Sequence, residues 1–287
     1  MNKVLNAISI DVEDYFQVNA FANDIRMDDW DTFKCRVERN TECILEKFAD
    51  HNCLGTFFIL GWVAERFPEL VAKIDRAGHE VASHGYSHQL IYNQDQKVFK
   101  EETLKSKAVL EDITGKKVRG YRAASYSITD KSLWAFDTLI EAGFEYDSSV
   151  FPVRHDVYGI RDFPKEPHLY TGSDSGSIVE FPISTCKFLG YELPVAGGGY
   201  FRLYPYWFTR YCLNRLNREN RSFVFYLHPW EVDPDQPRVE SANWKSRFRH
   251  YNNLEKCEQR LTSLIQDFQF SSVENVLIQK GLLDKRP

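Results

Sequence analysis

The chain has 287 residues, of which 43% are hydrophobic and 15% aromatic, and its formal net charge is −5. This length fits one barrel-type α/β domain, and the hydrophobic content excludes a disordered chain. The negative charge argues against nucleic acid as the main partner, because phosphate binding requires a basic surface.

The hydrophobic pattern predicts seven buried strands that alternate with helices. The strands are expected at residues 4–12, 54–60, 79–83, 118–123, 144–147, 178–183 and 223–227. Helical spacing and terminating glycines indicate the main helices at residues 33–49, 64–77, 95–113, 131–142, 206–217 and 254–268. Such alternation is typical of parallel pairing with right-handed crossovers, and seven strands favour a closed or nearly closed barrel.

The sequence shows no pattern typical of a signal peptide or of a membrane span. The N-terminal residues contain no apolar stretch long enough for a signal peptide, and no run of about 18 apolar residues occurs elsewhere. The six cysteines form no C-x-x-C pair. We therefore expect a cytoplasmic protein with reduced thiols and no transmembrane segment.

Titratable residues follow the carboxyl ends of several predicted strands, which is where α/β barrels form their sites. In chain order they are Asp11, Glu13, Asp14, His84, His88, Arg122, Tyr126, Asp147, His228 and Glu231. We therefore predict that loops from distant parts of the chain meet around one site.

A metal site is the first chemistry that this pattern indicates. His84 and His88 are four residues apart, which would place both imidazoles on one face of a helical turn, although two core or exposed histidines would also explain the pair. The acids at positions 11, 13 and 14 repel one another, so a cation among them is expected to stabilise them. One carboxylate would bind the metal ion and another would accept a proton. Two histidines and one carboxylate leave positions open for water and substrate, as in catalytic sites.

The residues after the later strands supply candidate proton donors and supports. His228 would most often be a core or capping residue, but beside a hydrolytic metal ion it fits a general acid that protonates a departing amine. Asp147 could orient His228 and keep it cationic. Arg122 could pair with Asp11 and keep it deprotonated, or could form an ordinary ion pair at a strand end.

The same segments resemble, in this order, the motifs of NodB-type polysaccharide deacetylases, carbohydrate esterase family 4. His84-Gly-Tyr-Ser-His88 resembles the metal-binding motif, and Tyr-Arg-Ala-Ala-Ser-Tyr at 121–126 resembles the motif that supports the catalytic base. Asp147-Ser-Ser and Leu-His228-Pro are similar to the two last motifs. The likeness extends from residue 8 to about residue 230.

The resemblance implies a distorted (β/α)7 barrel of the polysaccharide deacetylase type. It also implies a single domain over residues 1–287, with a family-specific C-terminal extension from about residue 235. The implied activity is metal-dependent removal of N-acetyl groups from amino sugars of an oligo- or polysaccharide. The default ion is Zn²⁺, with Co²⁺, Ni²⁺ or Fe²⁺ as alternatives.

The resemblance also assigns roles to residues. Asp11 corresponds to the base, His228 to the acid, Arg122 to the support of the base, and the backbone N–H of Tyr126 to part of the oxyanion hole. The metal carboxylate stays open between Glu13 and Asp14, because the family commonly has two adjacent aspartates where this chain has Asp-Val-Glu-Asp. Glu13 is favoured, since a residue two positions along a strand returns to the side of Asp11.

A narrower resemblance is to the deacetylase branch associated with exosortase and exopolysaccharide gene clusters. It rests on the segments at 11–17, 193–202 and 228–234. This branch implies an exopolysaccharide or its precursor as substrate, with Tyr200 and Trp230 as candidates for stacking on sugar rings. Two alternatives remain: a ring-amide hydrolase of the allantoinase-like type, and a carbohydrate-binding protein without turnover.

Overall fold

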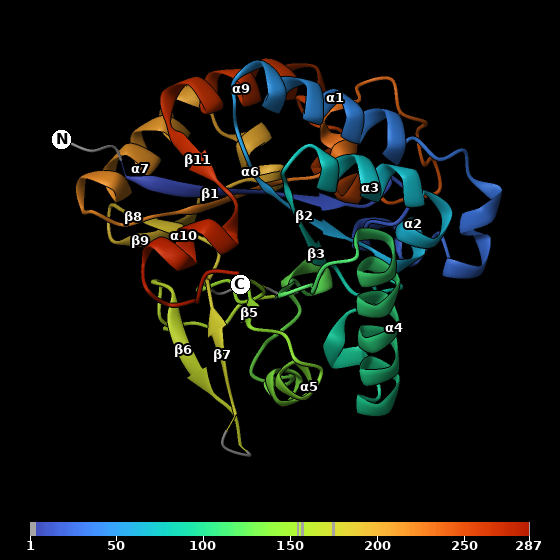
Figure 1. Ribbon diagram of the computed structural model, residues 1–287. Helices are drawn as coiled ribbons and strands as arrows, with labels where there is room; N and C mark the ends of the chain where they lie inside the picture. Colours follow the sequence, from blue (N-terminus) through green and yellow to red (C-terminus); the bar gives the residue numbers. More distant parts are fainter. Residues whose placement is uncertain (1–3, 154, 156–157, 174–175, 287) are drawn as a thin grey trace.

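The computed structural model describes residues 4–153, 155, 158–173 and 176–286. It consists of a large, mostly parallel sheet with helices on its outer side (Figure 1). The strands are β1 (Leu5–Val12), β2 (Thr56–Ile59), β3 (Glu80–Ser83), β4 (Gly120–Tyr121), β5 (Tyr146–Asp147), β6 (His168–Thr171), β7 (Ser177–Glu180), β8 (Thr185–Phe188), β9 (Tyr191–Pro194), β10 (Val224–Leu227) and β11 (Gln269–Ser271). The α-helices are α1 (Val37–Asp50), α2 (Gly61–Arg66), α3 (Pro68–Arg76), α4 (Gln96–Thr114), α5 (Ala135–Glu141), α6 (Gly198–Leu203), α7 (Tyr206–Arg218), α8 (Trp244–Tyr251), α9 (Leu254–Asp267) and α10 (Val273–Gln279). None of the helices in these ranges is both long and apolar enough to cross a membrane.

The hydrogen-bonded strand order is β10-β1-β2-β3-β4-β5-β7-β6, and β11 pairs with the first residues of β1. Among the described strands of this sheet, β6 runs antiparallel to its neighbour, and β8 and β9 form a separate antiparallel pair. On the open side of β10, the Ala196 carbonyl accepts a hydrogen bond from the Tyr226 amide at 3.0 Å, and the Ser184 hydroxyl accepts one from the Val224 amide at 3.0 Å. The predicted distorted (β/α)7 barrel is confirmed, with these irregular segments beside β10 in place of a regular strand.

The alternation of side chains along β1 explains how a buried strand can deliver a carboxylate to the site. Ile8, Ile10 and Val12 belong to the larger hydrophobic cluster, which includes the buried side chains of α1 and α9. Ala7 belongs to the second cluster inside the barrel, and Asp11 lies on this same side because side chains two apart in a strand share a face. Burial of the apolar face therefore fixes the direction of Asp11.

The helix predicted at 64–77 is two helices. α2 ends at Arg66 and α3 begins at Pro68, whose lack of a backbone N–H suits the first position of a helix and not its middle. The elements β6, β8, β9, β11, α6, α8 and α10 were not predicted from the sequence.

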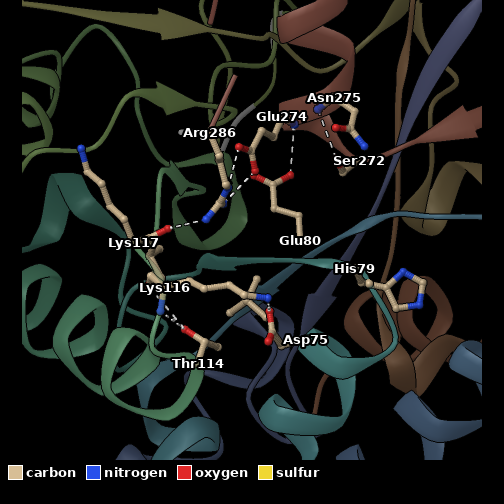
Figure 2. Close-up of a pocket in the computed structure, with 13 residues that line it drawn as sticks. Asp75, His79, Glu80, Thr114, Lys116, Lys117, Ser272, Glu274, Asn275 and Arg286 are labelled. Atoms are coloured by element: carbon tan, nitrogen blue, oxygen red, sulfur yellow. Dashed lines mark hydrogen bonds and ion pairs between the residues drawn. The ribbon is translucent and has the colours of Figure 1, made fainter. Parts of the chain in front are cut away.

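The amino-terminal end of the barrel is closed by the last helix and the chain end. A cavity of about 210 Å³ lies there, and Figure 2 shows Arg286 beside Glu274 on its wall. Arg286 donates to both carboxylate oxygens of Glu274 at 2.7 and 2.8 Å and to the Lys117 carbonyl at 3.1 Å. Burial and the charge of Glu274 raise the pKa of Glu80 to about 7. These contacts tie α10 to the starts of β3 and β4, at the opposite strand ends from the polar residues predicted to form the site.

His79, just before β3, predicts a pH dependence of stability. Its ring packs on Phe57 at 4.9 Å between centroids, and burial lowers its pKa to about 4. The folded pKa lies below the unfolded value of about 6.5, so the folded protein binds fewer protons and loses stability as the pH falls from about 6.5 toward 4. We expect the wild type to lose about 2 kcal/mol more than His79→Gln between pH 7 and 4.5.

Urea denaturation at the two pH values measures this difference. His51→Gln, at the end of α1, is the matched control and should behave as the wild type. Equal losses in the wild type and His79→Gln would contradict the prediction.

Candidate active site

The loops at the carboxyl ends of β1, β3, β4 and β10 converge on one cluster of polar side chains. The structure brings together Asp11, Glu13, His84, His88, Arg122, Tyr126 and His228. Their side chains are buried or nearly so, although each is charged or strongly polar. Because burying such groups is costly without partners, the contacts within the cluster are needed to stabilise them.

Glu13, His84 and His88 form a group that could hold a metal ion. Each offers one ligand atom, and these atoms lie within 4.8 Å of one another. Glu13 Oε2 lies 2.7 Å from Nε2 of His88, but the contact lacks hydrogen-bond geometry. This buried oxygen therefore has no hydrogen-bond donor among the described residues, which fits a cation between the three side chains. One carboxylate and two imidazoles suit Zn²⁺ and similar divalent ions and leave coordination positions open.

The two histidines reach this point from a loop and not from a helical turn, so the geometric reason given for their spacing was wrong. Residues 84–88 follow β3 without helix, and both Gly85 (φ 74°) and His88 (φ 52°) adopt the left-handed region. These two reversals of the backbone fold the loop back, and the ring centroids of His84 and His88 lie 5.4 Å apart.

His84 is held in one orientation by the backbone of the next strand. Its Nδ1 lies 2.9 Å from the Arg122 carbonyl, which can only accept, so Nδ1 carries the proton and Nε2 has a free lone pair. Burial lowers the pKa of His84 to about 4. A neutral imidazole with a fixed tautomer is the form that binds metal ions.

Asp14, the alternative to Glu13, lies away from the histidines and caps a helix. Its carboxylate accepts hydrogen bonds from the backbone amides of Tyr15, Arg36 and Val37 at 2.9, 2.6 and 2.9 Å. The last two amides stand at the start of α1, where backbone N–H groups lack partners within the helix. The structure therefore brings Glu13, and not Asp14, to the histidine pair.

Asp11 is the centre of a buried network inside the barrel. Arg122 Nη1 donates to Asp11 Oδ1 at 2.7 Å and to the Ser9 hydroxyl at 2.6 Å. The other guanidinium nitrogens donate to the carbonyl and hydroxyl of Ser148 at 3.0 and 2.9 Å. Arg122 is fully buried, and its positive charge is paired with the Asp11 carboxylate in the interior of the barrel.

His228 faces both carboxylates from the end of β10. Its Nε2 lies 3.6 Å from Glu13 Oε1 and 4.0 Å from Asp11 Oδ2, while its Nδ1 lies 2.8 Å from Glu231 Oε2. Burial alone would lower the pKa of His228, but the charges of Glu13, Glu231 and Asp11 raise it to about 9. These three carboxylates therefore favour the protonated imidazole.

Asp147 does not fulfil the role predicted for it, because Glu231 occupies the position beside His228 Nδ1. Asp147 accepts hydrogen bonds from the amide and hydroxyl of Ser149 at 2.9 and 2.7 Å. It also pairs with Glu180, whose pKa is raised well above its usual range by burial and by the Asp147 charge. Asp147 thus orders the strand end that carries Ser148, a partner of Arg122.

Two further predicted roles differ in the structure. The Tyr126 amide donates to the Ala123 carbonyl at 3.1 Å, so it is not free for an oxyanion, whereas the Tyr126 hydroxyl donates to Asp11 Oδ2 at 3.3 Å. Trp230 is 5% exposed and cannot stack on a sugar. Its ring packs between His228 and His250, and its Nε1 donates to Glu13 Oε1 at 3.2 Å. Tyr200 is partly exposed and lines a cavity, as a sugar contact requires.

The role of Glu231, whose place at the site was predicted, and the contribution of Arg202 were not predicted from the sequence. Glu231 also accepts from the His228 amide at 3.0 Å, which makes a reciprocal cap of the 3₁₀ turn at Pro229–Val232. The sequence pattern that could have indicated this cap is an acidic residue three positions after His228, with a proline between them. Arg202 donates to Glu231 Oε1 at 2.6 Å, but it lies 29 residues away in the chain, and no local pattern indicates this contact.

Comparison with known proteins agrees with this geometry. Residues 27–144 match the family model described as polysaccharide deacetylase, and residues 148–278 match a domain of unknown function, DUF3473. The peptidoglycan-N-acetylglucosamine deacetylase of Bacillus cereus is 32% identical over 150 residues, covering 48% of this chain and 53% of that protein. The chain thus spans about half the length of this curated relative.

Two solved structures share the fold. A Mycobacterium smegmatis protein assigned as a polysaccharide deacetylase superposes with a TM-score of 0.64 at 20% identity, covering 100% of this chain and 94% of that chain. Puue allantoinase superposes with a TM-score of 0.65 at 13% identity, covering 99% and 92%. At these identities the likeness concerns the fold alone. The matched segments thus make the first half of the chain similar to polysaccharide deacetylases and the second half similar to DUF3473, and both halves contribute strands to the same sheet.

Proposed function

We propose that this protein is a metal-dependent hydrolase that removes N-acetyl groups from the amino sugars of a glycan. The proposal rests on one observation: candidate metal ligands and a candidate acid–base pair lie together in one buried cluster. Glu13, His84 and His88 form the metal-binding set, and Asp11 and His228 form the acid–base set beside it. A merely structural metal site would not need a charged acid–base pair within 4.0 Å of each other.

The reaction adds water to an acetamide and yields acetate and a free amine. A divalent ion bound by Glu13, His84 and His88 supplies Lewis-acid polarisation of the carbonyl and lowers the pKa of water. Asp11, paired with Arg122, accepts the proton of the attacking water. His228, oriented by the contact of its Nδ1 with Glu231, donates its Nε2 proton to the nitrogen that leaves. The two protons thus pass through two separate groups, a carboxylate on β1 and an imidazole after β10.

The Glu231 contact predicts a shift in the pH profile. His228 must be protonated to act as the acid, so activity is lost as the pH rises through its pKa. Glu231→Gln removes one of the charges that raise this pKa, and the alkaline limb of kcat/KM should move to lower pH by about one unit. A pH series of initial rates measures the limb, with the exposed Glu255→Gln as control. An unmoved alkaline limb in Glu231→Gln would contradict this role.

The proposed substrate class is an exopolysaccharide or its precursor that carries N-acetylated amino sugars. The Bacillus cereus relative is named for peptidoglycan N-acetylglucosamine, which contains the same kind of amide bond. Zn²⁺ is the proposed ion, with Co²⁺, Ni²⁺ and Fe²⁺ as the alternatives for this donor set.

Acetate release tests the proposal. The purified chain is incubated with N-acetylglucosamine oligomers and, separately, with allantoin, with and without added Zn²⁺. We expect zinc-dependent acetate release from the oligomers and no ring opening of allantoin. Turnover of allantoin would favour the ring-amide hydrolase, whose fold this chain shares. Binding of the oligomers without acetate release under any metal ion would favour a binding protein without turnover.

A further inference from the structure

A cavity of about 410 Å³ lies beside the proposed active site, on the side built by the DUF3473 segment. Its lining comes largely from α6, α8 and their neighbours, among them Tyr158, Tyr200, Phe248 and Arg249, and from Tyr226 on β10. All of these residues fall within the matched range 148–278. The volume is in the range of pockets that hold small molecules or single sugar units.

Aromatic contacts connect this cavity to the reacting groups. The ring of Tyr226 lies 4.9 Å from that of Tyr126 and 5.7 Å from that of His228, between centroids. The Tyr126 hydroxyl in turn donates to Asp11 at 3.3 Å. Tyr226 therefore borders both the cavity and the catalytic cluster, so a neighbouring unit of a glycan could reach the cavity while the amino sugar lies at the cluster.

The glycines at 197 and 198 make this wall possible. Gly197 (φ 134°) and Gly198 (φ 53°) adopt conformations that side chains disfavour. A Cβ on Gly197 would lie 2.0 Å from the Tyr226 carbonyl oxygen, and one on Gly198 would lie 2.6 Å from the Tyr226 hydroxyl. The start of α6 thus lies directly against β10, and Tyr200 comes to the cavity as a consequence.

A single buried arginine joins the cavity wall to the catalytic acid. Arg202 on α6 donates to Glu231, the partner of His228, at 2.6 Å. It also donates to the backbone carbonyls of Arg249, His250 and Asn252 at 3.0, 2.8 and 2.8 Å. The end of α8 and the orientation of His228 therefore depend on the same side chain.

The cavity combines aromatic rings with an unpaired positive charge. The hydroxyls of Tyr158 and Tyr200 lie 3.3 Å apart, and their rings offer flat apolar surfaces of the kind on which sugars stack. Arg249 is exposed and makes no ion pair with the described residues. Burial raises the pKa of Tyr158 and the charge of Arg249 opposes this rise, so the guanidinium lies within electrostatic reach of that phenol. Arginine binds carboxylates and phosphates through paired donors.

We propose that the DUF3473 segment forms a substrate subsite in this cavity that binds an anionic group of the glycan, next to the amino sugar being deacetylated. The anion is a carboxylate of an acidic sugar or a phosphate of a glycosyl phosphate, since both match a guanidinium. The inference rests on the proposed deacetylase function. It adds a substrate class, an acidic amino-sugar glycan, and a role for the segment.

Titration calorimetry on the full chain tests the subsite, with acetate followed in the same samples. The ligands are a hyaluronan tetrasaccharide, which alternates N-acetylglucosamine with glucuronic acid, neutral chitotetraose, and N-acetylglucosamine 1-phosphate. We expect the wild type to bind at least one of the two acidic ligands roughly tenfold more tightly than chitotetraose. Arg249→Gln should abolish this preference and leave chitotetraose binding within about twofold. Arg247→Gln, also exposed on α8 but outside the cavity, should keep the preference.

The three ligands and the two variants distinguish the possible results. A preference for hyaluronan alone identifies a carboxylate, and one for the phosphate alone identifies a phosphate. Equal binding of acidic and neutral ligands by the wild type would overturn the subsite, as would an Arg249→Gln effect shared by chitotetraose or reproduced by Arg247→Gln. Arg249-dependent binding without acetate release from any ligand would support the subsite and contradict the deacetylase function.

Discussion

His84→Ala is expected to remove the bound divalent ion and to lower kcat/KM for acetate release by roughly a thousandfold or more. His84 Nε2 is one of three ligand atoms in the group with Glu13 and His88, and its tautomer is fixed by the Arg122 carbonyl. The variant would keep only one histidine and one carboxylate as ligands, whereas a catalytic zinc centre has three protein ligands.

Elemental analysis of the dialysed protein and initial rates measure the two effects together. His168→Ala, on β6 and outside the cluster, is the control and should keep both metal and activity. Full activity in His84→Ala would contradict the site assignment.

Arg122→Met is expected to lower the free energy of unfolding by about 3–5 kcal/mol, because it leaves the Asp11 charge buried without its partner. Arg122 is fully buried, and its donors also hold Ser9 and Ser148. The double variant Asp11→Asn/Arg122→Met should be more stable than the sum of the single losses predicts, because the unpaired charge is then absent.

Urea denaturation of the double-mutant cycle measures this coupling. Arg215→Met breaks an exposed ion pair with Glu219 and a hydrogen bond to the Lys187 carbonyl, and it should lower the free energy of unfolding far less than Arg122→Met. A similar loss in the free energy of unfolding for Arg122→Met and Arg215→Met would show that the buried network does not contribute the expected stability.

The fold was predictable where side-chain alternation or helical spacing was strong. The apolar runs of β2 and β10 marked them as strands of a parallel sheet buried on both faces, and the strand ends then gather the polar residues. The short elements escaped prediction because their own sequences do not favour them. α6 begins with two glycines, which are poor helix formers, and it exists because it packs against β10 and through Arg202.

The site was predictable at the level of strand ends and less so at the level of contacts. The two-residue period of β1 favoured Glu13 over Asp14, and the structure brings Glu13 to the histidines. Glu231 and Asp147 both follow strands whose carboxyl ends were predicted to lie near His228. Strand position alone could not show which of the two would contact its imidazole. Trp230 shows the same limit, because a tryptophan beside a site can support it or bind a ligand.

The central claim is that Glu13, His84 and His88 hold one divalent ion between them. Anomalous X-ray scattering from crystals grown with Zn²⁺, recorded on both sides of the zinc absorption edge, tests it directly. We predict a single strong peak about 2.0–2.2 Å from the three ligand atoms. A peak elsewhere, or no peak between these side chains in crystals grown with excess Zn²⁺, would contradict the account.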